Sequence, residues 1–174
     1  MSSRKRPLKR FGRAADQRLP AEQAADEGEI GAAAVALLAR RDYSSGELTQ
    51  KLRGQGYSAA AVHAVISDLI EHRFLDDARY AAHFASYHAE RGHGPLRIRR
   101  DLAGFDLEDT LIEAALESAG DWAQRAREVR IRKFGLSVPK NWRDKARQAR
   151  FLQYRGFSAD HIRSALGPDL DLDS

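Results

Sequence analysis

The stretch ERGHGPLRI, residues 90–98, contains the sharpest turn signal in the chain. At its centre, Gly94 and Pro95 should end one helix and begin the next, because proline fixes its own φ angle and suits the first helical position. Beyond this turn, Ile98 and Leu102 lie four residues apart with arginines between them. The spacing predicts a short helix with one apolar side and one cationic side.

The helix after this turn belongs to a pattern that repeats every fifty residues. Five columns of residues align at this offset: Leu52, Leu102 and Leu152; Gly56, Asp106 and Gly156; Tyr57, Leu107 and Phe157; Val62, Ile112 and Ile162; Ile66, Leu116 and Leu166. A period of this size is typical of stacked helical units that cannot bury their apolar sides alone. We therefore predict an all-α fold of three tandem three-helix units, nine helices in all, forming an elongated, curved body.

Each unit should begin its helices at recognisable caps. The expected units occupy residues 29–72, 73–119 and 120–167, and the helical pattern itself starts at Ile30. In unit one, Ser44 can cap a helix while the Glu47 side chain returns the bond, which is a capping box. Asp76 is the expected cap in unit two. Asp106 stands where the other units have glycine, and aspartate tolerates the left-handed conformation better than most residues.

Two groups of aromatic residues could either be buried in the core or take part in binding. In unit two, a stripe at helical spacing favours the core by ordinary burial preference: Tyr80, Phe84 and Tyr87. In unit three, Phe134, Trp142 and Tyr154 could stack on nucleic-acid bases. Burial preference nevertheless favours the core for Phe134 and Trp142.

The two ends of the chain differ in composition from the middle. Residues 1–13 contain six basic residues and no acidic one, and the following stretch to residue 28 is rich in alanine and mostly acidic. We expect residues 1–28 to form a flexible arm, with room for some helix near its end, because few apolar residues are available to order it. The arm either solubilises the chain or contacts nucleic-acid phosphates. Residues 168–174 should form a short acidic tail.

Positive charge is concentrated in the third unit. The whole chain carries 29 lysines and arginines against 25 aspartates and glutamates, a net charge of +4. Between Trp122 and Arg155 there are eleven basic residues and two acidic ones. Such an excess favours a polyanionic partner.

The register of the repeat predicts which arginines point outward. On an ideal helix with Leu152 facing the core, the opposite side carries Arg143, Arg147 and Arg150. The same construction about Leu102 places Arg97 and Arg100 outward. Stacking of the units would then align these arginines along one side of the body. That geometry suits a phosphate backbone or the groove of a polymeric protein.

No pattern in the sequence indicates catalysis. The chain has no cysteine, which excludes disulfides, thiolate nucleophiles and cysteine-ligated zinc. His83 and His88 are five residues apart and so miss the spacing of a helical metal pair. There is no glycine-rich phosphate loop, no serine-histidine-acid arrangement and no membrane-length apolar run. We expect no catalytic residue, metal or cofactor, no membrane partner and a cytoplasmic location.

Three segments, in this order, resemble the RecX family of small bacterial regulators of the RecA recombinase: ARRDYSSGEL (39–48), FLDDARYAAHF (74–84) and ERGHGPLRI (90–98). The likeness extends over about residues 30–166. It implies tandem three-helix units and binding in the helical groove of a RecA filament, with interference in ATP hydrolysis and strand exchange or promotion of filament disassembly. It also implies binding to single- and double-stranded DNA, and no cofactor or catalytic residue.

The resemblance and the repeat together suggest roles for particular residues. The candidates for contact with RecA or DNA are Arg91, Arg97 and Arg100, joined through the repeat register by Arg143, Arg147 and Arg150. The structural positions are Tyr80, Phe84, Ile98 and Leu102 in the core and Gly94 and Pro95 in the turn. Two competing hypotheses remain open: an architectural DNA-binding protein that acts without RecA, and a helical adaptor for an unrelated protein. A monomer is the default oligomeric state.

Overall fold

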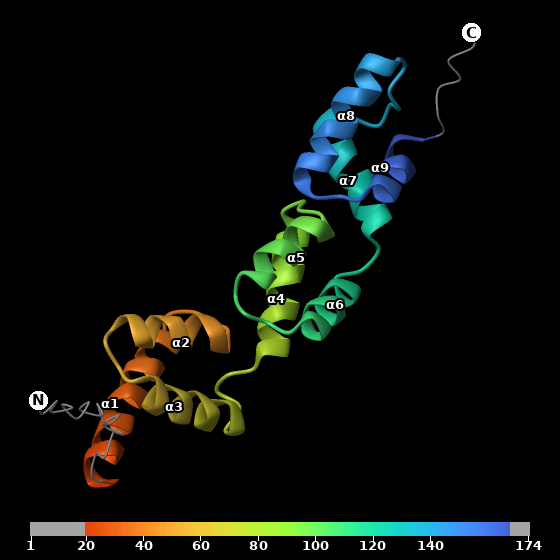
Figure 1. Ribbon diagram of the computed structural model, residues 1–174. Helices are drawn as coiled ribbons and strands as arrows, with labels where there is room; N and C mark the ends of the chain where they lie inside the picture. Colours follow the sequence, from red (N-terminus) through yellow and green to blue (C-terminus); the bar gives the residue numbers. More distant parts are fainter. Residues whose placement is uncertain (1–19, 168–174) are drawn as a thin grey trace, which may run out of the picture.

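The computed structural model describes residues 20–167, which form nine helices and contain no strand (Figure 1). The helices are α1 (Pro20–Leu38), α2 (Ser45–Gly54), α3 (Ala59–Glu71), α4 (Asp77–Glu90), α5 (Pro95–Ala103), α6 (Asp109–Ser118), α7 (Trp122–Phe134), α8 (Trp142–Arg155) and α9 (Ala159–Leu166). They pack as three successive three-helix units along an elongated, curved body. The predicted all-α repeat fold is confirmed.

The first helix is longer than the sequence pattern indicates. It begins at Pro20, ten residues before the start predicted at Ile30, so the last part of the expected arm is helical. Alanine and glutamate, which dominate this stretch, are strong helix formers even where they bury little. The rest of the expected arm and the expected acidic tail lie outside the described residues.

Each unit buries an apolar cluster of its own, and the repeat columns supply much of it. Leu52, Leu102 and Leu152 are fully buried at equivalent positions of the three units. Ile98 is fully buried as well. The chain leaves the second helix of each unit through a residue with positive φ, at Gly56 (98°), Asp106 (58°) and Gly156 (92°). Asp106 therefore adopts the left-handed conformation that glycine adopts at the equivalent position of the other two units.

In unit two, α4 contributes small residues to the buried core rather than the predicted aromatic stripe. Along α4, the fully buried positions that face α6 are Ala81, Ala85 and Ala89. Tyr80 and Phe84 are only partly buried and pack against the ring of Phe105, with centroids 5.8 and 5.5 Å away. Tyr87 is 54% exposed, so its assignment to the core is wrong. Alanine lets the two helices approach closely, which displaces the larger rings to the edge.

Units two and three are joined through their second helices. The backbone N–H of Gly94, the N-cap of α5, donates to the carbonyl oxygen of Arg155 over 2.8 Å, and that of Leu96 donates to Gly156 over 3.0 Å. A Cβ atom on Gly94 would lie 2.3 Å from the carbonyl carbon of Gly156, so only glycine fits. The free N–H groups that begin α5 thus satisfy carbonyls that end α8.

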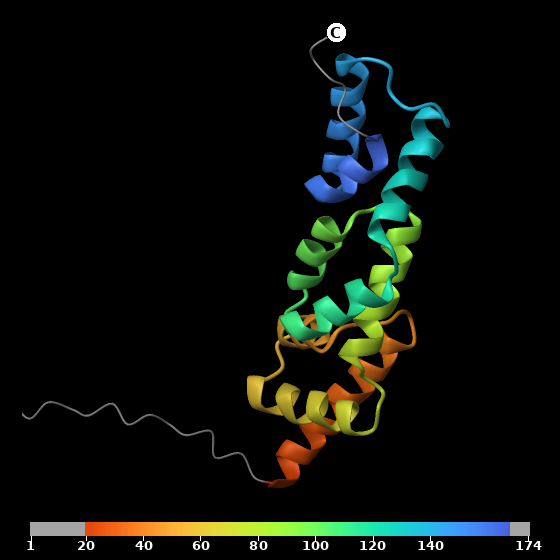
Figure 2. The same cartoon turned by 90° about the vertical axis from the view of Figure 1, so that its right-hand side faces the viewer.

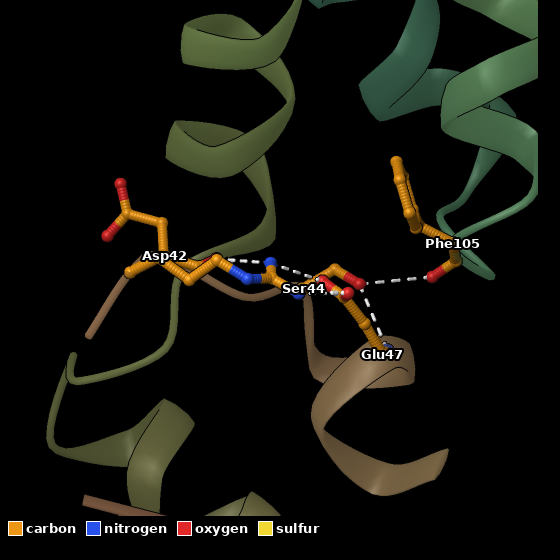
Figure 3. Close-up of polar contacts among 5 residues, drawn as sticks. Asp42, Ser44, Glu47 and Phe105 are labelled. Carbon is orange, nitrogen blue, oxygen red and sulfur yellow. Dashed lines mark hydrogen bonds and ion pairs between the residues drawn. The ribbon is translucent and has the colours of Figure 1, made fainter. Parts of the chain in front are cut away.

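Units one and two are joined at the equivalent positions, fifty residues earlier. The hydroxyl of Ser44, the N-cap of α2, donates to the carbonyl oxygen of Phe105 over 3.2 Å (Figure 3). Asp77 at the start of α4 accepts from the backbone N–H of Ser45 over 2.8 Å. A Cβ atom on Gly46 would lie 2.6 Å from the Phe105 oxygen. Both joints therefore rest on close contact between the start of one helix and the end of another.

The two joints connect the second helices end to end, α8 to α5 to α2; α8 and α5 follow one another along the body, whereas α2 lies across the direction of α5 (Figures 1 and 2). At each joint the carbonyl end of one helix meets the start of the next, so the negative end of one helix dipole faces the positive end of its neighbour. We call these three helices the second-helix row.

The caps follow the prediction with one exception. Ser44 accepts from the backbone N–H of Glu47 over 3.1 Å, and Asp76 caps α4. The Glu47 carboxylate pairs with the guanidinium of Arg41 over 2.9 Å, and no bond to the Ser44 N–H forms (Figure 3). The predicted capping box is therefore half formed, because a cation offers the carboxylate a stronger partner than a neutral N–H.

Candidate interaction surface

A groove of about 960 Å³ is lined by residues of α5, α8 and α9. We call it the junction groove. Its buried lining is apolar and includes Phe157 and Leu166. Of the described residues that line it, four are cationic and none is acidic: Arg97, Arg100, Lys145 and Arg163. The groove therefore combines an apolar floor with a positive edge.

Two large aromatic side chains flank the junction groove and face solvent. Trp142 is 65% exposed and Tyr154 is 83% exposed. The assignment of Trp142 to the core is wrong. Trp142 is the first residue of α8, and a position at the end of a helix has neighbours on one side only. Phe134 is half-buried, with its ring edge-on to Phe151 at 5.3 Å.

Two of the six arginines predicted for binding line the junction groove. The side chain of Arg100 is 75% exposed. The Arg97 side chain is only half-exposed, because it packs on the backbone of Gly156. The two are so close that a Cβ atom added to Gly156 would lie 2.5 Å from the Cβ atom of Arg97. The Nε atom of Arg97 lies 3.7 Å from the carboxylate of Asp101. Arg97 thus belongs partly to the joint between units two and three, and Arg100 alone of this pair is a purely surface cation.

Three further predicted arginines are exposed on α8 without lining the groove: Arg143, Arg147 and Arg150. Arg147 forms an ion pair with Asp144 at 3.1 Å, and its guanidinium lies 5.5 Å from the centre of the Phe134 ring. The helix construction about Leu152 predicted these exposures correctly. The three side chains extend the positive surface along the second-helix row.

The sixth predicted arginine, Arg91, lies elsewhere. Its guanidinium packs on the ring of Tyr87, 4.7 Å from the centroid, and donates to the hydroxyl of that residue. It lines a separate hollow of about 120 Å³ together with Arg132, Lys133 and Arg155. The six residues therefore do not form one site.

Two cations of the junction groove were missed by the sequence reasoning. On an ideal helix with Leu152 facing the core, Lys145 falls on the inward side, so the helix construction does not predict it at a surface groove. No sequence motif singles out Arg163. The repeat aligns Arg163 with His63 and Glu113. The charge at this repeat position differs among the three units, and this difference was the available signal. Whether the side chain lines a groove, however, depends on where α9 packs.

A pair of histidines lies beside the turn at Gly94. The Nδ1 atoms of His88 and His93 are 3.1 Å apart, and the two rings are stacked with centroids 5.1 Å apart. Burial lowers the pKa of both side chains, and the charge of Arg97 lowers both further. Across residues 20–167 no group of three or more side chains is arranged to hold a metal ion.

The sequence matches the first, second and third three-helix domains of RecX at residues 32–69, 76–116 and 121–166. It is 46% identical to the regulatory protein RecX of Halorhodospira halophila over 134 residues, which cover 76% of this chain and 83% of that protein. The chain belongs to the RecX family. The RecX of Vibrio vulnificus is 40% identical over 137 residues, covering 78% of this chain and 90% of the relative.

Solved RecX structures share the fold at low sequence identity. The crystal structure of RecX from Lactobacillus salivarius has a TM-score of 0.70 and 21% identity, and the likeness covers 80% of this chain and 93% of that one. A second RecX crystal structure has a TM-score of 0.68 and 18% identity, covering 80% and 71%. The relatives are named regulatory proteins. In the described part of this RecX-family chain, no helix has the length and apolar character needed to cross a membrane.

Proposed function

We propose that this protein regulates homologous recombination and the SOS response by lying along the helical groove of a RecA–DNA filament. There it inhibits ATP hydrolysis and strand exchange, and it acts in the cytoplasm as a monomer without catalytic activity of its own. Membership of the RecX family supports the proposal, because RecX proteins are regulators of RecA.

One observation carries the proposal for this chain in particular. The α5 and α8 portions of the second-helix row contain about 35 Å of helix at 1.5 Å per residue, and both expose arginines. A long cationic surface suits a long anionic partner better than a compact one. Arg100, Arg147 and Arg150 are the contacts we propose first, because their side chains are exposed on the row.

Direct contact with single- and double-stranded DNA belongs to the same proposal. Arginine guanidinium groups bind phosphate in a bidentate manner. Trp142 and Tyr154 are exposed beside these cations and offer rings on which unpaired bases can stack. The same two features favour the second candidate function, an architectural protein that binds DNA without RecA.

Salt dependence separates the two candidates. We would measure single-stranded-DNA-dependent ATP hydrolysis by the cognate RecA, titrated with this protein at two salt concentrations and repeated on preformed filaments. Binding through phosphates alone weakens with a log-log slope of about 0.7 per single-strand phosphate neutralised. The filament proposal predicts inhibition well below one protein per RecA that persists at the higher salt. Binding to DNA with no inhibition at either salt would favour the architectural function.

A further inference from the structure

The junction groove has the properties of a binding site for a peptide that is both acidic and apolar. Phe157 and Leu166 are buried in its floor, while Leu96, Trp142 and Tyr154 remain exposed around it. A concave apolar surface with a few polar groups is typical of ligand sites. The four cations and the absence of any acidic side chain among its described lining residues select an anionic ligand.

The chain itself contains a segment of this chemistry. Residues 168–174 read PDLDLDS, so aspartates alternate with leucines. Successive side chains of an extended backbone point to opposite sides. An extended segment would thus present Leu170 and Leu172 on one side and three carboxylates on the other. The apolar floor of the junction groove complements the leucine side of the segment, and its positive edge complements the carboxylate side.

The segment also starts in the right place. The last helix, α9, ends at Leu166, which itself lines the groove. Seven extended residues reach at most about 24 Å. The distance along α8 from Trp142 to Tyr154 is about 18 Å at 1.5 Å per residue. A ligand tethered this closely has an effective concentration in the millimolar range.

We propose that the C-terminal segment 168–174 binds the junction groove of its own chain and covers Arg97 and Arg100. Docking requires no other partner. If the anionic partner proposed above binds the same groove, the segment competes with it and is autoinhibitory. This second step rests on the function proposed above. A segment that occupies the groove nine-tenths of the time weakens a competitor about tenfold.

The two tryptophans make docking measurable. Trp142 borders the groove, whereas the indole N–H of Trp122 donates to the carbonyl oxygen of Leu116 over 3.0 Å and serves as an internal reference. We would compare the two indole signals in ¹H–¹⁵N spectra of the full chain and of a variant with Asp169, Asp171 and Asp173 changed to asparagine. The matched control changes three exposed glutamates to glutamine: Glu71, Glu90 and Glu117.

We call the variant with the three asparagines the tail variant. The proposal predicts that its Trp142 signal is shifted from that of the parent and its Trp122 signal is not, independently of protein concentration. The control variant should match the parent. Added peptide PDLDLDS should restore the parent position in the tail variant, and PNLNLNS should not. An unchanged Trp142 signal overturns the proposal. A shift that disappears on dilution also overturns it, because the groove would then hold the tail of a second copy.

Affinity for single-stranded DNA tests the competition separately. We expect the tail variant to bind about tenfold more tightly than the control variant. If the Trp142 signal shifts as expected but the two affinities agree, docking stands and DNA does not use this groove. In that case the assignment of Arg97 and Arg100 to partner binding fails, and the tail proposal survives without its inhibitory role.

Discussion

The backbone N–H of Gly94 donates to the carbonyl oxygen of Arg155 over 2.8 Å, across sixty-one residues of sequence. The stretch that turns the chain within unit two therefore also fastens unit two to unit three. A glycine-proline pair predicts the turn by itself, since both preferences are local. The joint depends on a neighbour in the next unit, which local reasoning does not include.

Replacing Gly94 by alanine should weaken this joint. The new Cβ would meet backbone atoms of Gly156, which cannot rotate away as a side chain would. The φ angle of Gly94 is −86°, so the substitution adds crowding without backbone strain. We expect the free energy of unfolding to fall by about 1–3 kcal/mol, the usual range for overpacking. Urea unfolding followed by circular dichroism would measure the change.

Gly54 provides the matched control for this substitution. It lies in α2, and an added Cβ would have nothing within 4 Å. Alanine there should stabilise the protein by up to about 1 kcal/mol, because glycine is a poor helix former. Equal effects of the two substitutions would show that the contact between Gly94 and Gly156 contributes nothing to the joint.

Asp106 should tolerate only residues that accept the left-handed conformation. Its φ angle is 58°, and the cost of this conformation is about 1–2 kcal/mol for an ordinary residue. We expect Asp106→Val to lower the free energy of unfolding by at least about 1 kcal/mol. Asp106→Asn should change it little, because asparagine shares the tolerance of aspartate. A valine variant as stable as the asparagine variant would contradict this account.

Much of the fold could be predicted because its signals are local. For example, α8 runs from Trp142 to Arg155, between Pro139 and Asn141 before it and Gly156 after it, and each of these residues favours a helix end by its own local preference. The sequence allowed some helix near the end of the arm but did not place its start at Pro20, because an alanine-rich acidic stretch has little apolar periodicity to detect. The position of the aromatic stripe was missed for another reason: the approach of α4 to α6 depends on Ala81, Ala85 and Ala89, whose small size gives no strong signal.

Acidification should destabilise the protein through the histidine pair beside Gly94. Burial lowers the pKa of His88 and His93, and nearby arginines lower both further, while Asp101 opposes them. Below the ordinary value of 6.5, the unfolded chain therefore takes up protons that the folded chain resists. The free energy of unfolding should fall as the pH drops below 6.5, and His93→Gln should reduce this slope. Urea unfolding at several pH values would measure it.

His72 supplies a control of opposite sign. Its ring Nδ1–H donates to the backbone carbonyl oxygen of Asp68, and the Asp68 carboxylate is close by, so the pKa of His72 is raised. The folded chain then holds this proton better than the unfolded one, and the stabilisation is lost as the pH rises through the raised pKa. Replacing His72 by glutamine should steepen the loss of stability on acidification. If His93→Gln and His72→Gln changed the pH dependence of the free energy of unfolding in the same direction, the destabilising role assigned to His88 and His93 would be contradicted.

The candidate surface could be predicted only in part. Exposure of Arg147 and Arg150 follows from the geometry of a single helix, so the repeat register was sufficient. The junction groove arises from the crossing of α5, α8 and α9, which lie apart in sequence. For this reason Lys145 and Arg163 were not recognised as its lining. Arg91 and Arg97 became candidates together because both lie in the ERGHGPLRI segment that resembles the RecX family, yet Arg91 lines a different hollow.

The most direct test of the proposed interface replaces three exposed arginines of the second-helix row by alanine: Arg100, Arg147 and Arg150. Arg97 is left intact because it also belongs to the joint between units. The control removes three exposed arginines that lie outside the second-helix row: Arg40, Arg79 and Arg132. Exposed substitutions usually change stability by less than about 0.5 kcal/mol, which circular dichroism would verify for both variants.

The deciding measurement is inhibition of ATP hydrolysis by preformed RecA–DNA filaments, titrated with the parent protein and both variants. We predict that the row variant needs at least about tenfold more protein for half-inhibition, equivalent to about 1.4 kcal/mol of binding free energy. The control variant, which loses the same charge, should inhibit as the parent does. Full inhibition by the row variant at the parent's concentration would contradict the claim that the second-helix row contacts the filament.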